Sequence, residues 1–148
     1  MLPSNLTVKS QEALRIAQET AVEYRHAVLE PLHLLFGLLS QDEGVVPTLL
    51  KKLGLNVTGL LQDIRSSFER MPHQLGGTAA QLGISPELSR VMQQAEKVAR
   101  SFTDEYISTE HLLLGLLEAP SIGQELKRIG VTEEAVLKAL KDVRGNTR

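Results

Sequence analysis

The sequence contains no cysteine and no tryptophan, and aromatic residues make up only 3% of it. Without cysteine there can be no disulfide framework, no thiol nucleophile and no thiolate-bound metal. No apolar run approaches the roughly 20 residues that a membrane-spanning helix needs. The first residues also lack the charged segment and apolar run of a secretory signal. We therefore expect a cytoplasmic protein that does not have a membrane as a partner.

A strong excess of charge of one sign is also absent. The 16 basic and 18 acidic residues leave a formal net charge of −2, which does not favour nucleic acid as a partner. The sequence also lacks a GxxxxGK(S/T) phosphate-binding loop, a GxSxG nucleophile elbow and an HExxH zinc helix. These absences argue against catalysis, so we expect a binding domain with no catalytic residues and no cofactor of its own.

The chain is rich in residues that favour helices. Alanine, leucine, glutamine, glutamate and lysine are frequent, and all are good helix formers. Runs of alternating β-branched residues, which would indicate strands, are absent. The 148 residues suit one domain with a single hydrophobic core. The composition predicts an all-α fold.

One ten-residue segment occurs twice. Residues 30–39 read EPLHLLFGLL and residues 108–117 read STEHLLLGLL, so the histidine, the glycine and most of the leucines coincide. Similarity continues on both sides of each segment. We interpret the chain as two helical repeats, the first at about residues 6–70 and the second at about 84–144, joined by a glycine-bearing linker at about 71–83.

The spacing of apolar residues, together with caps and glycine stops, predicts four helices in the first repeat. Thr7 is placed to cap the first helix, Pro31 suits the first position of the second, and Gly54 ends the third. The second repeat follows the same plan. We therefore expect a pseudo-twofold arrangement in which the two leucine-rich helices form the core and alanine-rich helices flank them. The helices predicted in the first repeat cover about residues 7–24, 31–40, 45–53 and 56–68.

His33 and His111 are open to two interpretations, as metal ligands or as structural residues. Glu30 and His33 have the Glu-x-x-His spacing of carboxylate-bridged di-iron bundles, which need two such motifs. The second copy has Ser108 where the first has Glu30, so the pair of motifs is incomplete. We favour a structural role in which each imidazole lies in the first turn of its helix and bonds to neighbouring backbone, and we predict no metal site.

Glycine recurs inside both leucine-rich helices, at Gly37 and Gly115. A glycine in a helix interior costs about 1 kcal/mol relative to alanine. Its presence in both copies indicates that another helix approaches closely at this point. The alternative, a tolerated glycine inherited by duplication, stays open on the sequence alone.

The connector into the second leucine-rich helix differs in character from its counterpart. Asp104 replaces His26 of the first copy, and Glu110 replaces Leu32. In a duplicated fold, residues that occur in only one of the two copies are candidates for a functional role. The alternative is an ordinary solvated loop held by an apolar side chain.

These features together resemble a known family. A paired repeat that begins with LT and AL-x-x-A, continues with HLL-x-GLL and has a short helix ending in LG is similar to the Clp N-terminal domain of the Hsp100 AAA+ chaperones. The resemblance covers essentially the whole chain. The FERMP sequence at residues 68–72 and the ending at residues 143–146 are most similar to the ClpB type. The ClpC and ClpA types are the alternatives.

The resemblance implies a mobile domain above a hexameric ring, which contacts unfolded or aggregated polypeptide and helps deliver it to the central pore. It implies a parent AAA+ ATPase with ATP and magnesium in its ATPase modules, and an Hsp70 system as a further partner. Residues 145–148 would begin the linker to those modules. The alternative that the family offers is docking of adaptors and substrates in a Clp protease regulator.

The resemblance also implies which residues bind substrate. The positions attributed to substrate binding in ClpB match Thr7, Asp104 and Glu110 here, and an apolar patch beside them maps to positions that include Met92 and His111. His111 departs from the family pattern, because ClpB often has an apolar residue there. A shallow apolar groove rimmed by carboxylates would suit exposed hydrophobic segments that have lysine or arginine nearby.

Overall fold

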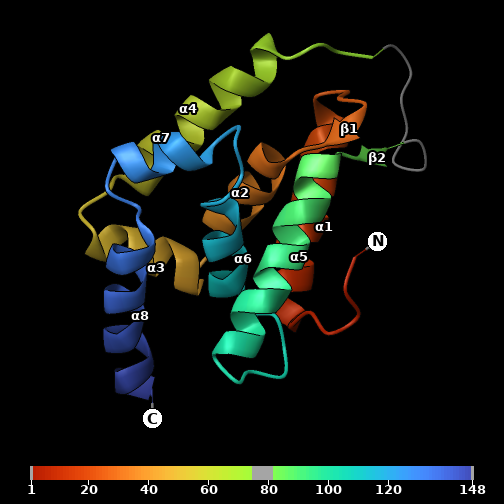
Figure 1. The fold of residues 1–148 in the computed structure, drawn as a ribbon. Helices are drawn as coiled ribbons and strands as arrows, with labels where there is room; N and C mark the ends of the chain where they lie inside the picture. The colour runs from red at the N-terminus through yellow and green to blue at the C-terminus, as the bar shows by residue number, and fades with distance from the viewer. Residues whose placement is uncertain (1, 75–81, 148) are drawn as a thin grey trace.

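The structure, a computed structural model, describes residues 2–74 and 82–147 and shows the helices arranged as in Figure 1. The first copy forms α1 (Val8–Glu23), α2 (Pro31–Leu39), α3 (Val45–Lys52) and α4 (Val57–Arg70). The second copy forms α5 (Pro86–Ser101), α6 (Thr109–Leu116), α7 (Gly123–Arg128) and α8 (Glu133–Thr147). The predicted all-α class and its two four-helix repeats are confirmed. None of the helices in these described parts is long and apolar enough to cross a bilayer.

Helix α1 and its counterpart α5 begin with the same kind of cap. The hydroxyl of Thr7 accepts a hydrogen bond from the Ser10 backbone N–H at 3.1 Å. The hydroxyl of Ser85 likewise accepts from the Leu88 N–H at 3.0 Å. Each cap satisfies one of the backbone donors that a helix start leaves without an intrahelical partner. The predicted capping role of Thr7 is confirmed.

The third helix of each copy ends at a glycine. Gly54 has a φ of +84° and Gly130 a φ of +103°, a left-handed conformation that residues with a Cβ avoid. After Gly54, the Leu55 N–H donates back to the Leu50 carbonyl at 3.0 Å. This is the glycine C-cap that the sequence predicts, and it turns the chain toward the fourth helix.

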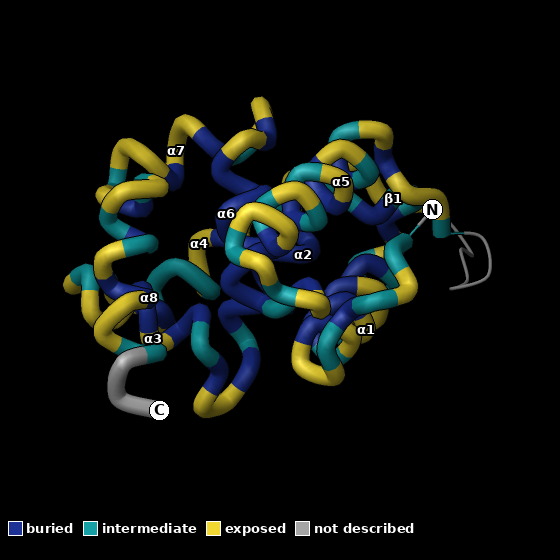
Figure 2. The backbone as a smooth tube through the Cα atoms, turned by 60° about the horizontal axis from the view of Figure 1, so that its bottom comes forward, coloured by how far each residue is buried: buried dark blue, intermediate teal, exposed yellow. Residues whose placement is uncertain are grey.

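The hydrophobic core is centred on α2 and α6, as predicted. Every residue of α6 is buried, and in α2 only Leu32 is not. Helix α1 packs on α2, α5 packs on α6, and α2 contacts α6 between them. Figure 2 shows the two leucine-rich helices as mostly dark blue segments at the centre of the molecule, with exposed residues on the surrounding helices.

The two recurring glycines lie where helices approach most closely. A Cβ placed on Gly37 would be 2.2 Å from the backbone oxygen of Ala13 in α1. A Cβ on Gly115 would be 2.7 Å from the backbone oxygen of Val91 in α5. Both distances are shorter than real Cβ contacts, so each glycine allows its alanine-rich neighbour to pack against the leucine-rich helix. The predicted close approach is confirmed.

Short strand pairings link the two copies crosswise. Strand β1 (Val28–Leu29), in the first connector, pairs in parallel with β2 (Gly83–Ile84), at the start of the second copy. The reciprocal pairing joins Leu6, at the start of the first copy, to Ile107 in the second connector. These pairings cannot be predicted from the sequence pattern, because a two-residue strand has no detectable alternation. Residues 75–81 of the predicted linker lie outside the described residues.

Candidate functional site

The connector between α5 and α6 brings three of the residues implied by the resemblance into one region. Its residue Ile107 accepts a hydrogen bond from the Thr7 backbone N–H at 3.1 Å. Asp104 lies earlier in the same connector, and Glu110 lies in the first turn of α6 that follows it. The Thr7 side chain bonds within its own helix, to Ser10. Thr7 therefore supports the connector, while the two carboxylates form the cluster described next.

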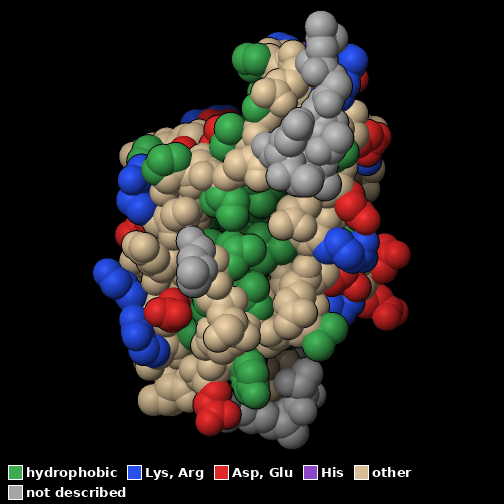
Figure 3. All heavy atoms as spheres, turned by 90° about the vertical axis from the view of Figure 1, so that its right-hand side faces the viewer, with side chains coloured by type: hydrophobic (Ala, Val, Ile, Leu, Met, Phe, Trp, Pro, Cys, Tyr) green, Lys and Arg blue, Asp and Glu red, His purple; other side chains and the backbone are tan. Residues whose placement is uncertain are grey.

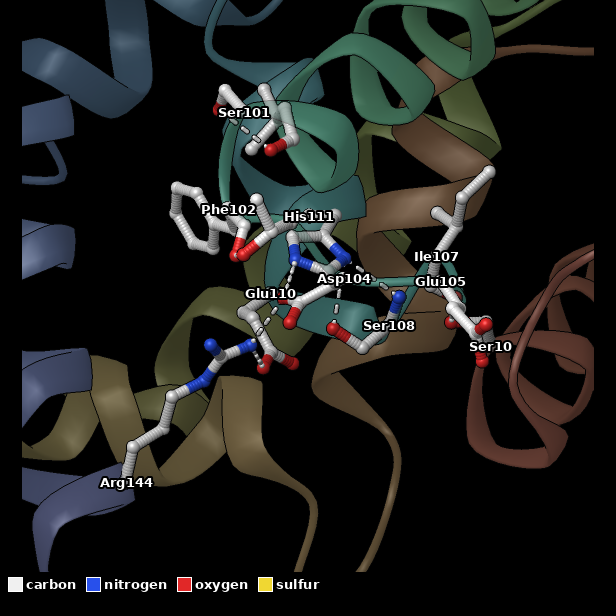
Figure 4. Close-up of polar contacts among 12 residues, drawn as sticks. Ser10, Ser101, Phe102, Asp104, Glu105, Ile107, Ser108, Glu110, His111 and Arg144 are labelled. Carbon is white, nitrogen blue, oxygen red and sulfur yellow. Dashed lines mark hydrogen bonds and ion pairs between the residues drawn. The ribbon is translucent and has the colours of Figure 1, made fainter.

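Asp104 and Glu110 share one guanidinium. Arg144, in the last turn of α8, donates through Nη2 to Glu110 Oε2 at 2.8 Å and to Asp104 Oδ2 at 3.1 Å. Figure 4 shows the arginine side chain extending from α8 toward both acids. The Glu110 side chain is 8% exposed, and those of Asp104 and Arg144 are 31% and 33% exposed. The buried carboxylate is thus paired with a cation, while the more exposed carboxylate faces solvent in part.

The buried side chain of His111 orients the Asp104 carboxylate of this cluster. Its Nδ1 accepts from the Ser108 backbone N–H at 2.9 Å, so the proton of a neutral ring lies on Nε2. That Nε2–H donates to Asp104 Oδ2 at 2.9 Å. Burial lowers the pKa of His111 below its ordinary value, although Glu110 and Asp104 act in the opposite direction. The predicted bond from the imidazole to neighbouring backbone is confirmed, and the ring also holds Asp104 in place.

Met92 and His111 do not form an exposed apolar patch in this structure. Met92 is 1% exposed and His111 is 0% exposed. Met92 lies on the face of α5 that packs against the core, at the position that the buried Leu14 has in the first copy. Neither side chain can be touched by a ligand without a rearrangement, and of the two His111 bonds to a site residue, Asp104.

A cleft with a mixed apolar and charged lining lies beside the cluster, and its charged lining residues are Lys97, Glu118, Lys127 and Glu133. It has a volume of about 410 Å³ and lies between α5, α6 and α8. Phe102 joins the two features, because its ring lines the cleft, lies 5.2 Å from the His111 ring and is covered by the Arg144 guanidinium at 5.5 Å. The other apolar side chains that line the cleft are Val98, Leu114, Leu117 and Leu137.

Phe102 and Arg144 also belong to this site, and neither is among the site residues expected from the sequence. The repeat contains a signal for Arg144, because extending the alignment of the two copies along the last helix pairs Arg144 with Phe68 in the sequence. Phe68 is fully buried in the first copy. An arginine at the position of a core phenylalanine indicates a changed environment, and the changed residues around it are Asp104 and Glu110.

In the first copy, the equivalent cluster consists of His33, His26 and Phe68, which contain no charged pair and are buried. His33 Nδ1 accepts from the Glu30 backbone N–H, and its Nε2 lies 2.8 Å from Nδ1 of His26. His26 Nε2 then lies 3.0 Å from the Phe68 carbonyl oxygen, so each ring donates to the next acceptor when both are neutral. Both ring nitrogens of His33 are therefore engaged. In residues 2–74 and 82–147, no group of three or more histidine and acidic side chains is arranged to hold a metal ion.

Two further surfaces offer apolar atoms. A second cleft of about 420 Å³ lies between α2, α4 and α7, and its lining includes Leu60, Ile64, Ile122 and Ile129. On the face that carries α1 and α5, Figure 3 shows hydrophobic side chains in a central band, with charged side chains toward the edges. Neither surface has a buried carboxylate paired with an arginine, which is the distinguishing feature of the cleft beside Phe102.

Solved structures with the same fold are N-terminal domains of Clp-type proteins. The Hsp104 N-terminal domain from Candida albicans has a TM-score of 0.81 and 22% identity, over 96% of this chain and 93% of that chain. The ClpV N-domain in a complex with a VipB peptide has a TM-score of 0.74 and 22% identity, over 93% of this chain and 86% of that chain. The fold is therefore that of a Clp N-terminal domain.

Sequence comparison defines the family. The Clp repeat (R) N-terminal domain family matches residues 5–129 and 95–145, and the chain belongs to this family. Chaperone protein ClpB of Clostridium perfringens (strain 13 / Type A) is 33% identical over an alignment that covers 100% of this chain and 18% of that protein. The chain thus spans less than a fifth of the length of that relative, and the resemblance to the ClpB type is confirmed.

Proposed function

We propose that this domain recognises unfolded or aggregated polypeptide for a ClpB-like, ATP-dependent disaggregase. The observation that carries the proposal is the cleft of α5, α6 and α8, because its lining residue Phe102 also contacts His111 and Arg144 of the carboxylate cluster. Similarity to ClpB supports the kind of parent protein. The ClpV N-domain that has been solved with a VipB peptide supports peptide binding as a property of this fold.

The chemistry of the cleft selects a kind of segment. Its leucine, valine and phenylalanine side chains would cover apolar residues that a folded client keeps inside. Asp104, partly exposed in the cluster that Phe102 joins to the cleft, would favour segments with an adjacent lysine or arginine. A cleft of this size buries little area, so binding is weak and a client is released readily.

The five residues implied by the resemblance have different parts in this proposal. Asp104 and Glu110 supply the negative charge, with Asp104 the more accessible of the two. Thr7 holds the connector through its backbone and caps α1. Met92 and His111 act from the interior, His111 by positioning Asp104.

The full-length parent in this proposal is a cytoplasmic hexameric AAA+ ATPase. ATP and magnesium would bind in ATPase modules outside this chain, which lacks a phosphate-binding loop. The domain would then deliver captured segments to the ring for threading. A second candidate is docking of an adaptor protein in a Clp protease regulator, as in the ClpC and ClpA types. The N-domain complex with VipB peptide is equally compatible with a dedicated partner.

Binding of a fluorescently labelled unfolded model polypeptide tests the proposed site. Asp104→Ala and Glu110→Ala should each weaken binding severalfold, and Thr7→Ala should weaken it less, with helix content unchanged by circular dichroism. Asp63→Ala is the matched control, because this exposed carboxylate lies beside the second cleft, on α4. Unchanged affinity in all three site variants would show that the site is wrongly assigned. Binding of one folded adaptor without binding of unfolded chains would favour the second candidate.

A further inference from the structure

The two copies of the repeat differ in the residue that completes the cluster around the histidine, which is an apolar ring in the first copy and a charged side chain in the second. In the first copy, the Phe68 ring stacks on His33 with centroids 4.9 Å apart, and both residues are fully buried. In the second copy, Arg144 stands at the corresponding position. It completes the cluster by its charge instead of by an apolar ring. A guanidinium can leave such a contact for water at far lower cost than a buried phenylalanine can.

The position of Arg144 makes this exchange easy. Its side chain is 33% exposed and lies in the last turn of α8, where helices fray most readily. Glu110, which Arg144 contacts, is less able to move, because its side chain is 8% exposed and belongs to the fully buried helix α6. Glu110 is thus fixed in the core, Asp104 is held by its hydrogen bond from His111, and the arginine is the movable partner.

We propose that Arg144 is an internal competitor for the substrate site, so that its guanidinium occupies the Asp104–Glu110 cluster until an arginine of a bound polypeptide replaces it. This inference rests on the proposed function, because it assigns a regulator to the same cleft. Phe102 connects the two events, since its ring both lines the cleft and carries the Arg144 guanidinium. Replacement of Arg144 also releases the last turn of α8.

Competition of this kind lowers the apparent affinity of the open site. We call the contact of the Arg144 guanidinium with Asp104 and Glu110 the latch, which is open when Arg144 has left the two carboxylates. If the latch is open about 10% of the time, a ligand that needs the open form binds about tenfold more weakly than it would without the latch. The effect is restricted to ligands that carry a cationic side chain. Apolar contacts in the cleft do not require Arg144 to move, so segments without a cation bind equally with the latch open or closed.

The latch can be tested without any polypeptide ligand, by chemical rescue. In Arg144→Ala, Asp104 and the buried Glu110 face each other without their shared cation, and the melting temperature should fall. Millimolar guanidinium chloride should restore part of the loss, while sodium chloride at equal ionic strength should not. Arg100→Ala, which removes an exposed arginine of α5, is the control and should show no rescue. Rescue equal in both salts, or in both variants, would overturn the latch.

The competition itself is tested with two peptides that differ in one group. One carries an apolar segment followed by arginine, and the other has citrulline in place of that arginine. Arg144→Ala should bind the arginine peptide about tenfold more tightly than the unmodified domain does, with the citrulline peptide unchanged. Equal or weaker binding of the arginine peptide by the variant would overturn the proposal. If neither protein binds either peptide but guanidinium rescue succeeds, the proposed function fails and the latch alone stands.

Discussion

Replacing Gly37 by alanine should destabilise the domain, although the same change inside an ordinary helix is stabilising. The gain in helix propensity is about 1 kcal/mol. Against it, the new Cβ would lie 2.2 Å from the Ala13 oxygen and 3.1 Å from the Ala13 carbonyl carbon. Both neighbours are backbone atoms of α1, so no side chain can rotate away. The two helices must separate, and α1 and α2 share the core of the first copy.

Overpacking of this kind typically costs about 1–3 kcal/mol, and an overlap with backbone belongs at the upper end of that range. After the propensity gain, we expect Gly37→Ala to lower the free energy of unfolding by about 2 kcal/mol. For a domain of this size, that corresponds to a fall of about 4–8 °C in melting temperature. Thermal and urea unfolding followed by circular dichroism measures both quantities.

Two further variants give the prediction a rank order. Gly115→Ala should cost less than Gly37→Ala, because its Cβ would lie 2.7 Å from the Val91 oxygen. Gly59→Ala is the control, since its nearest neighbour at 3.2 Å is the movable side-chain amide of Asn56, and its effect should stay within about 1 kcal/mol. A Gly37→Ala domain as stable as the unmodified one would refute the close approach of α1 and α2.

The remaining predictions concern acid stability and caps. Burial, and then the neighbouring His26, lower the pKa of His33 from 6.5 to about 4. Below about pH 6.5 the unfolded chain therefore binds a proton that the folded chain does not, and stability should fall by up to about 3 kcal/mol as the pH drops toward 4. Urea unfolding across this range should show the loss, and His33→Gln should show a smaller pH dependence; equal dependence in the two proteins would contradict the assignment. Thr7→Ala and Ser85→Ala should each lower the free energy of unfolding by about 1 kcal/mol. The exposed substitution Val8→Ala, which removes no cap, should change it by less than about 0.5 kcal/mol.

The sequence predicted the fold most accurately where local chemistry repeats. Thr7, Gly37 and Gly54 could be assigned because a cap, a close approach and a left-handed turn each demand a particular residue type. The same residue type, or a close equivalent, recurs in the second copy at each of these positions. A cap, a helix contact or a turn can be predicted more reliably when the same residue type occurs at the equivalent position of both copies.

The crossed strand pairing and the acid–arginine cluster could not be predicted in the same way. Leu6 and Ile107 meet only because the two copies are packed together, and a single hydrogen-bonded pair has no sequence period. Arg144 lies 34 residues beyond Glu110, and no local pattern joins them. Long-range contacts of this kind follow from the packing of α8, which the helix pattern alone does not orient.

The burial of Met92 shows where the resemblance and the repeat gave different indications. The resemblance placed Met92 near an apolar substrate patch, whereas the internal alignment paired it with Leu14. Leu14 is a core residue at 4% exposure, and Met92 is buried as well. The internal alignment therefore indicated the environment of this side chain, and the residues of this region that line the cleft are Val98 in α5 and Phe102 at its C-cap.

The most direct test of the proposed site is a titration of the isotope-labelled domain with an unfolded model protein, followed by NMR. We expect the shifts to concentrate at Val98, Phe102, Leu137, Asp104 and the last turn of α8. Shifts centred on Ile64 and Ile122, in the second cleft, or scattered over the whole surface would contradict this expectation.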